Sequence, residues 1–170
     1  RSRLGYVPQK GVLFSGTIDS NIRYGKTDIS ETEVKEAAEV AQATEFIDAK
    51  PEQYASPIAQ GGTNVSGGQK QRLSIARAIA KNPEIFIFDD SFSALDFKTD
   101  STLRKALKEH TKDATTIIVA QRISTILNAD KIIVLDDGHM AGIGTHGELM
   151  KNCEVYRQIA MSQLSEEELA

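Results

Sequence analysis

The chain has 170 residues, of which 40% are hydrophobic and 26% charged, and its net charge is −4. This length suits one domain with its own hydrophobic core, and the composition argues against a disordered chain. The net negative charge does not favour binding to the phosphates of nucleic acid. No apolar run approaches the roughly 20 residues of a membrane-spanning helix. The single cysteine, Cys153, cannot form a disulfide within the chain and suits a reducing compartment.

The first half of the chain is predicted to be mostly helical. Leu4–Val7 is a short apolar run that Pro8 stops, which is typical of a strand that leads into a loop. Ser30 and Glu33 have the spacing of a capping box, and apolar residues then recur at the helical period, so we expect a helix to begin there. Another helix with a wide apolar face is expected over residues 66–81.

The second half alternates apolar strands with helices. We expect buried strands over residues 85–88, 115–120 and 131–135, with a helix over 98–110 between the first two. Residues 136–139, Asp-Asp-Gly-His, are a hairpin turn signal that leads into a weak strand. Strands that are apolar throughout and alternate with helices predict an α/β fold with a parallel sheet covered on both faces.

The sharpest local signal lies at the start of the helix over residues 66–81. Gly67 and Gly68 directly before a helix would let backbone N–H groups approach a ligand closely, and a helix N-terminus favours negative charge. Ser66 adds a hydroxyl, and Gln69 can hydrogen-bond a ribose or phosphate oxygen. The segment therefore indicates either a phosphate-binding helix start or a plain glycine turn that caps a helix.

A second signal is the pair of acids, Asp89 and Asp90, that ends the apolar strand over residues 85–88. The carboxyl edge of a parallel sheet is where α/β proteins bind ligands. Asp89 is placed to hold Mg²⁺ through water, and Asp90 to polarise an attacking water. A solvated strand end with no ligand is the alternative interpretation of the same two residues.

Four motifs follow one another along the chain: Tyr6-Val-Pro-Gln9, Val65-Ser-Gly-Gly-Gln69, Ile85-Phe-Ile-Phe-Asp-Asp90 and Ser93-Ala-Leu-Asp96. Taken in order, they resemble the nucleotide-binding domain of an ABC transporter, and the resemblance covers essentially the whole chain. It implies an α/β fold: part of a RecA-like P-loop NTPase parallel sheet with an α-helical subdomain. The helical subdomain would span about residues 12–82, and part of the RecA-like core with the C-terminal helices would span 83–170. Residues 13–25 and 145–149 resemble the exporter branch of the family.

The resemblance implies ATP and Mg²⁺ as cofactors and assigns roles to individual residues. Gln9 would contact Mg²⁺ and the attacking water, Asp89 would hold Mg²⁺, and Asp96 would lie at a dimer interface. Residues 66–69 would bind the γ-phosphate of ATP held by a partner domain. The implied partners are the transmembrane domain of the same transporter and a second nucleotide-binding domain, with no nucleic acid, at the cytoplasmic face of the cell membrane.

Three positions depart from the family pattern. Asp90 stands where most members have Glu. The side chain of Asp is one methylene shorter, and a misplacement of the catalytic carboxylate by about 1 Å can cost on the order of 100-fold in rate. Gln121 stands where the switch histidine is expected, and glutamine offers no titrating imidazole. Gln60 stands where exporters often carry an acid. This pattern resembles the degenerate-site subunit of a heterodimeric exporter, in which residues 66–69 complete the partner's active site.

No Gly-x-x-x-x-Gly-Lys-Ser/Thr motif occurs in the 170 residues. In the family this phosphate loop lies upstream of the residue that Gln9 resembles, so we expect the chain to be truncated before it. We therefore expect negligible ATPase activity from the isolated chain. Two alternatives remain: a soluble ABC-type ATPase that acts on nucleic acid or ribosomes, and a non-catalytic half-domain that docks a membrane partner or donates residues 66–69.

Overall fold

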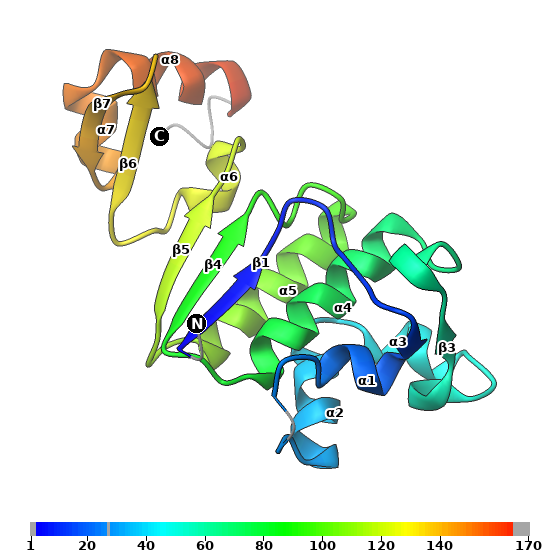
Figure 1. Ribbon diagram of the computed structural model, residues 1–170. Helices are drawn as coiled ribbons and strands as arrows, with labels where there is room; N and C mark the ends of the chain where they lie inside the picture. Colours follow the sequence, from blue (N-terminus) through cyan, green and yellow to red (C-terminus); the bar gives the residue numbers. More distant parts are fainter. Residues whose placement is uncertain (1–2, 27, 165–170) are drawn as a thin grey trace. The chain divides into compact units, whose positions relative to one another are not determined.

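The computed structural model describes residues 3–26 and 28–164 (Figure 1). The chain divides into two compact units, residues 1–119 and 120–170. No helix within the described ranges is both long and apolar enough to span a membrane.

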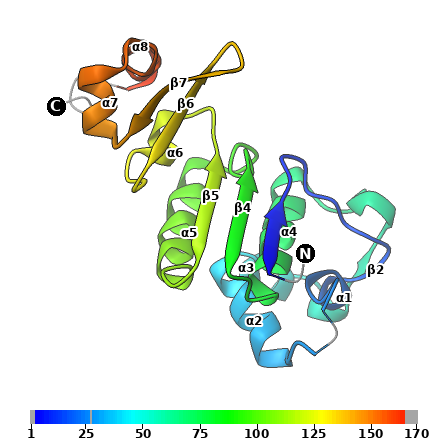
Figure 2. The same ribbon diagram turned by 60° about the vertical axis from the view of Figure 1, so that its left-hand side comes forward.

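A three-stranded parallel sheet organises the first unit (Figures 1 and 2). Its strands are β1 (Leu4–Val7), β4 (Ile85–Asp89) and β5 (Thr115–Val119), with β4 in the middle. Tyr6 pairs with Ile87, which pairs in turn with Ile117. The carboxyl ends of β1 and β4 therefore lie side by side, and the residues that follow both strands meet at one edge of the sheet.

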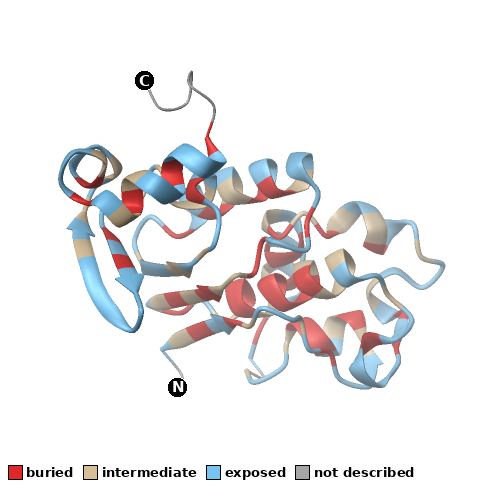
Figure 3. Ribbon diagram, turned by 90° about the horizontal axis from the view of Figure 1, so that it is seen from above, coloured by how far each residue is buried: buried red, intermediate tan, exposed pale blue. Residues whose placement is uncertain are grey.

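Burial alternates along β1 and β4, so only one face of this sheet is well buried (Figure 3). Val7, Phe86 and Phe88 on that face belong to the same core cluster as the apolar side chains of α4 (Gly67–Ala80) and α5 (Phe97–His110). The prediction of a sheet covered on both faces is wrong, because successive side chains of a strand point to opposite faces and only one face is packed by these helices.

Strand β5 also differs from the sequence prediction. It was expected to be buried, but four of its five residues are exposed, and the exposed fraction of Val119 is 52%. The reason is its place in the sheet: among the described strands it pairs with β4 alone and so forms an edge. An apolar run indicates a strand, but it does not say where in the sheet that strand lies.

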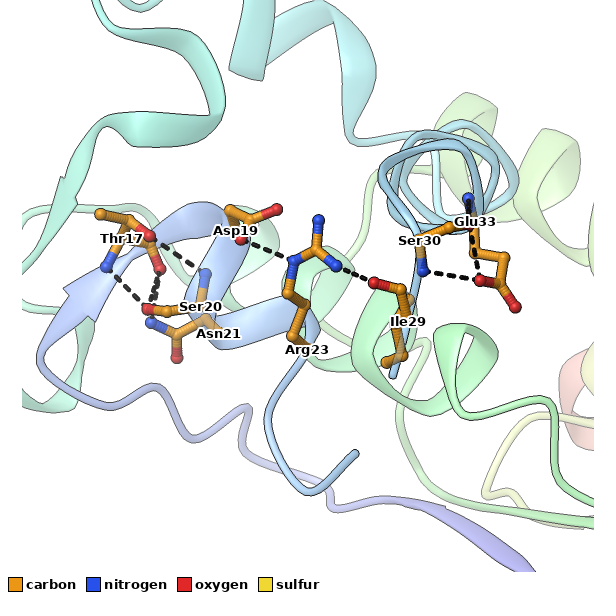
Figure 4. Close-up of polar contacts among 8 residues, drawn as sticks. All are labelled: Thr17, Asp19, Ser20, Asn21, Arg23, Ile29, Ser30 and Glu33. Atoms are coloured by element: carbon orange, nitrogen blue, oxygen red, sulfur yellow. Dashed lines mark hydrogen bonds and ion pairs between the residues drawn. The ribbon is translucent and has the colours of Figure 1, made fainter. Parts of the chain in front are cut away.

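The helical part of the first unit is built from short helices, and side chains cap the N-termini of two of them, α1 and α2. Ser30 caps α2 with the predicted capping box, in which the Glu33 N–H donates to the Ser30 hydroxyl and the Ser30 N–H donates to the Glu33 carboxylate (Figure 4). Thr17 and Ser20 form a similar box on α1. The elements are β2 (Gly16–Thr17), α1 (Ile18–Ile22), α2 (Glu31–Val40), α3 (Thr44–Asp48), the 3₁₀ turns Gln53–Ala55 and Gln60–Gly62, and β3 (Pro57–Ile58), which pairs antiparallel with β2.

Two arginines tie this helical part together. Arg23, the residue that follows α1, donates to Asp19 of that helix at 2.7 Å and to the backbone carbonyl of Ile29 just before α2 (Figure 4). Arg77 on α4 donates to the carbonyl of Val12 at 2.8 Å, and to the carbonyl and side-chain oxygen of Asn21 at 2.8 and 2.9 Å. The side chain of Arg77 therefore joins α4 both to the loop before α1 and to α1 itself.

The second unit contains a β-hairpin and three helices. The predicted hairpin is confirmed: β6 (Ile132–Asp136) pairs antiparallel with β7 (His139–Gly144), and Asp137 and Gly138 between them both have positive φ. Strand β6 was expected to extend the parallel sheet, but in the described chain it pairs with β7 only. The helices are α6 (Ile123–Ile126), α7 (His146–Asn152) and α8 (Glu154–Gln163), and they enclose a core that includes Val134, Leu149 and Tyr156.

Candidate functional site

The two predicted acids and the predicted glutamine meet at the carboxyl edge of the parallel sheet. Asp89 is the last residue of β4, Asp90 follows it, and Gln9 lies two residues beyond the end of β1. The Gln9 side-chain amide donates a hydrogen bond of 3.1 Å to the Asp90 carboxylate. Residues 81 apart in the sequence are thus in direct contact, because β1 and β4 are paired neighbours.

Asp89 accepts a hydrogen bond of 3.1 Å from the hydroxyl of Tyr6. This bond raises the pKa of Tyr6. Sequence reasoning used Tyr6 only as part of a motif and missed this contact. A signal was available, since Tyr6 lies opposite Ile87 and Asp89 is two residues further along β4, on the same face of the sheet.

The backbone after the acids is held in a defined shape. Asp90 has a left-handed φ of 44°, and its N–H donates to the carbonyl of Val119 at 2.8 Å. Ser91 is fully buried, and its hydroxyl donates to the carbonyl of Val7 at 2.8 Å. Ser93 donates from its hydroxyl to the Asp90 carbonyl at 2.9 Å. These bonds join the loop after β4 to both neighbouring strands and so fix the backbone that carries the acids.

The glycine segment forms the N-terminus of α4, as predicted. Ser66 is the N-cap: its hydroxyl accepts from the Gln69 N–H at 3.2 Å, and its N–H donates to the Gln69 side chain at 3.1 Å. A Cβ on Gly67 would meet no atom within 4 Å, whereas one on Gly68 would lie 3.4 Å from the carbonyl of Ala94. The polar side chains of the segment therefore cap the helix in this structure, while the backbone at Gly67 stays open to an approaching group.

Asp96 follows Ala94 closely and caps the next long helix, α5. Its carboxylate accepts from the Thr99 N–H at 2.9 Å, and the hydrogen bonds to Thr99 lower the pKa of Asp96. Since Gly68 packs against the Ala94 carbonyl, the segment that ends at Asp96 adjoins the start of α4. The structure thus brings two of the predicted motifs, residues 66–69 and 93–96, next to each other.

The sequence also singled out two glutamines, Gln121 and Gln60. Gln121 belongs to the second unit, two residues after β5, and its backbone carbonyl accepts from the Gln163 side chain at 2.9 Å. Gln60 is exposed and begins the 3₁₀ turn that precedes α4. For Gln121, the role as a residue of the same site therefore stays a prediction.

The donors at the sheet edge fit Mg²⁺, a hard cation that prefers oxygen ligands. Asp89 and Asp90 supply carboxylate oxygens, and Gln9 carries an amide oxygen beside them. No group of three or more His, Cys, Asp or Glu that could hold a metal occurs in the part of the chain that the structure describes. Mg²⁺ is commonly bound by one or two carboxylates together with substrate phosphates and water.

A surface pocket of about 390 Å³ lies elsewhere in the first unit, among α1, α2 and the 3₁₀ turn Gln53–Ala55. None of the predicted site residues lines it. Its rim carries the ion pairs Arg23–Asp19 and Lys35–Glu31, which balance one another in charge. The pocket therefore offers no concentration of positive charge for a phosphate.

Comparison with known proteins gives related sequences over nearly the whole chain. It is 47% identical to an uncharacterised ABC transporter ATP-binding protein of Mycobacterium tuberculosis, over 95% of this chain and 28% of that protein. It is 44% identical to the human ATP-binding cassette sub-family B member 5, over 96% of this chain and 13% of that protein. The chain thus spans less than a third of the curated relatives it matches.

A solved structure and a family profile agree with these relatives. The structure of a bacterial Atm1-family ABC exporter with ATP bound matches with a TM-score of 0.92 and 40% identity, over 98% of this chain and 29% of that one. The sequence profile described as ABC transporter matches residues 1–93 of the 170, which is more than half of the chain. The chain therefore belongs to the ABC transporter family, and it corresponds to the ATP-binding domain of its members.

Proposed function

We propose that the protein containing this chain hydrolyses ATP to power export across a membrane, with the chain forming part of one ATP-binding domain. The observation that carries the proposal is the contact between Gln9 and Asp90, directly beside Asp89, at the carboxyl edge of the sheet. An amide and two carboxylates at this edge can serve a metal-bound phosphate and the water that attacks it.

Each of these residues has a distinct part in the proposed reaction. Asp89 would hold Mg²⁺, with Gln9 as a further oxygen donor, and the ion supplies charge stabilisation for the phosphoryl group when bound. Asp90 would orient and polarise the attacking water, since its carboxylate lies next to the Gln9 amide. The loop bonds of Ser91 and Ser93 hold the backbone of this pair in place.

The start of α4 would serve a second site, on a partner domain. Its N-terminal N–H groups carry partial positive charge, and Gly67 leaves the backbone open for close approach of a γ-phosphate. Asp96, whose segment packs beside this helix start, would lie at the same domain interface. The partners are then a second nucleotide-binding domain and the transmembrane domain of the transporter, with the chain at the cytoplasmic face of the membrane.

The residue types at positions 90 and 121 suggest that the two sites of such a dimer differ. Asp90 and Gln121 would serve the site on this chain, which would hold ATP with slow or no turnover. Residues 66–69 would complete the partner's site, which would turn over normally. We therefore propose the degenerate-site subunit of a heterodimeric exporter.

The test is the double variant Asp90→Glu with Gln121→His in the intact heterodimer, with the partner's own site inactivated so that hydrolysis reports on this site alone. Turnover should rise, because the longer acid reaches the attacking water and the imidazole can titrate. The two single variants serve as matched controls. Unchanged turnover in the double variant would contradict the degenerate-site proposal while leaving the family assignment intact.

An ATPase that acts on nucleic acid or ribosomes is less well supported. Such a protein needs basic surface to neutralise phosphates, whereas this chain has a net charge of −4. A non-catalytic half-domain is distinguished by titrating the intact protein with ATP: binding without hydrolysis at either site would favour it.

A further inference from the structure

Tyr6 and Asp89 form a side-chain pair that lies across two strands. Tyr6 pairs with Ile87 in the backbone register, so its ring has to run along β4 for its hydroxyl to reach the residue two positions further on. The hydroxyl ends 3.1 Å from one oxygen, Oδ2, of the Asp89 carboxylate. The ring lies on the face that the helices leave uncovered, and 55% of Tyr6 is exposed.

Within the described residues, the bond from Tyr6 is the one hydrogen bond that a side chain donates to the Asp89 carboxylate. A carboxylate at a strand end can otherwise rotate about its terminal torsion, which is broad. The phenol engages Oδ2 and so restricts this rotation, while Oδ1 has no hydrogen bond from a side chain among the described residues. Asp90 has a different donor, the Gln9 amide, so each of the two acids is oriented by a residue of β1 or of the loop that follows it.

We propose that Tyr6 is a positioning residue, whose hydroxyl orients the Asp89 carboxylate toward a divalent cation. The inference rests on the proposed function, in which Asp89 is the carboxylate that holds Mg²⁺. Hydrogen bonds to a metal-ligating carboxylate fix its orientation, and their removal typically costs 10- to 100-fold in metal affinity or activity. In this role Tyr6 would act through Asp89, to which its hydroxyl donates, and not by direct contact with the nucleotide.

The experiment is a titration of the intact protein with Mn²⁺ in the presence of a non-hydrolysable ATP analogue, with bound and free Mn²⁺ measured by electron paramagnetic resonance. Tyr6→Phe removes only the hydroxyl and should weaken Mn²⁺ binding about tenfold. In a heterodimer only one of the two metal sites should weaken. Binding of the analogue without metal, measured in a chelator, should stay unchanged, because the fold and the phosphate contacts are not altered.

Tyr24→Phe is the matched control. Tyr24 is 52% exposed, its ring stacks on Phe14, and within the described residues its hydroxyl makes no hydrogen bond. It should bind Mn²⁺ like the unaltered protein. Asp89→Asn is the second reference and should abolish binding at this site, and adding Tyr6→Phe to Asp89→Asn should have no further effect.

These variants separate the inference from the function on which it rests. If Asp89→Asn loses Mn²⁺ and Tyr6→Phe does not, the role of Tyr6 is refuted and the proposed metal site stands. If Asp89→Asn keeps its Mn²⁺, the proposed metal site itself is refuted. A Tyr6→Phe variant that also loses metal-free binding would show a general disturbance of the site, and this too would overturn a positioning role.

Discussion

Replacing Arg77 by Met should lower the free energy of unfolding of the 170-residue chain by about 3 kcal/mol. The loss is the stabilisation from the three hydrogen bonds of the Arg77 guanidinium minus the cost of burying its charge. Arg77 donates to the carbonyl of Val12 and to both oxygens of Asn21. Its guanidinium also lies over the stacked rings of Phe14 and Tyr24, 5.2 and 5.4 Å from their centroids. Met keeps most of the aliphatic stem and removes the donors.

The magnitude follows from two opposing contributions. Hydrogen bonds from a charged donor contribute about 1.5–3 kcal/mol each, so the three together give about 5–9 kcal/mol. Burial lowers the pKa of Arg77 from 12.5 to about 10, and at about 1.4 kcal/mol per tenfold change this costs the charged form about 3 kcal/mol. The difference is about 2–6 kcal/mol, and water that reaches the freed carbonyls of this half-buried site places the expected loss in the lower part of that range.

The assay is urea unfolding followed by circular dichroism, with Arg3→Met as the matched control. Arg3 is an exposed arginine paired with Glu84, and exposed ion pairs contribute little. Arg3→Met should therefore unfold almost as the unaltered chain does, and Arg77→Lys should recover only part of the loss, because a single ammonium cannot reach three acceptors at once. If Arg77→Met unfolds at the same urea concentration as Arg3→Met, the account of Arg77 as the link between α4 and the loop before α1 is refuted.

Two further predictions concern the loop and the helix cap next to the acids. Ser91→Ala should cost about 1–3 kcal/mol in thermal or urea unfolding, because the buried Val7 carbonyl loses its hydroxyl donor, whereas Ser93→Ala, at an exposed position, should cost less. The pKa of Asp96 is lowered by its hydrogen bonds to Thr99, so its contribution to stability is fully present above about pH 4 and is lost as the pH falls through the lower folded-state value. Asp96→Asn keeps a capping side chain without the charge, so the two proteins should differ in urea midpoint at pH 6 and converge near pH 2; a constant difference would contradict this reasoning.

Local features of the fold could be predicted from the sequence because they depend on residues close together in the chain. The capping box of Ser30 follows from a side chain three residues away, and the hairpin after β6 follows from Asp137-Gly138. The small antiparallel pair of β2 and β3 was not predicted, since two residues per strand are too few to show an alternation of apolar and polar side chains.

Features that depend on which strands are neighbours could not be predicted from periodicity. The contact of Gln9 with Asp90 joins residues 81 apart and follows only once β1 is placed beside β4; a family resemblance suggested a common site but no geometry. Strand β5 looked buried because its residues are apolar, yet its position at the edge leaves them exposed. The side-chain hydrogen bonds of Arg77 and Tyr6 leave no local pattern in the sequence, because their acceptors lie on other elements of the fold.

The left-handed backbone at Asp90 has a consequence for the choice of side chain there. Asp and Asn adopt a positive φ several times more readily than other residues with a Cβ, because a short polar side chain can bond to the nearby backbone. A longer acid at this position has to accept the same backbone, at a cost of about 1 kcal/mol or more. At position 90 a longer acid would reach further toward the substrate, but a shorter one adopts the left-handed backbone at a lower cost. Asp90→Asn is the substitution that removes the charge while leaving the turn undisturbed.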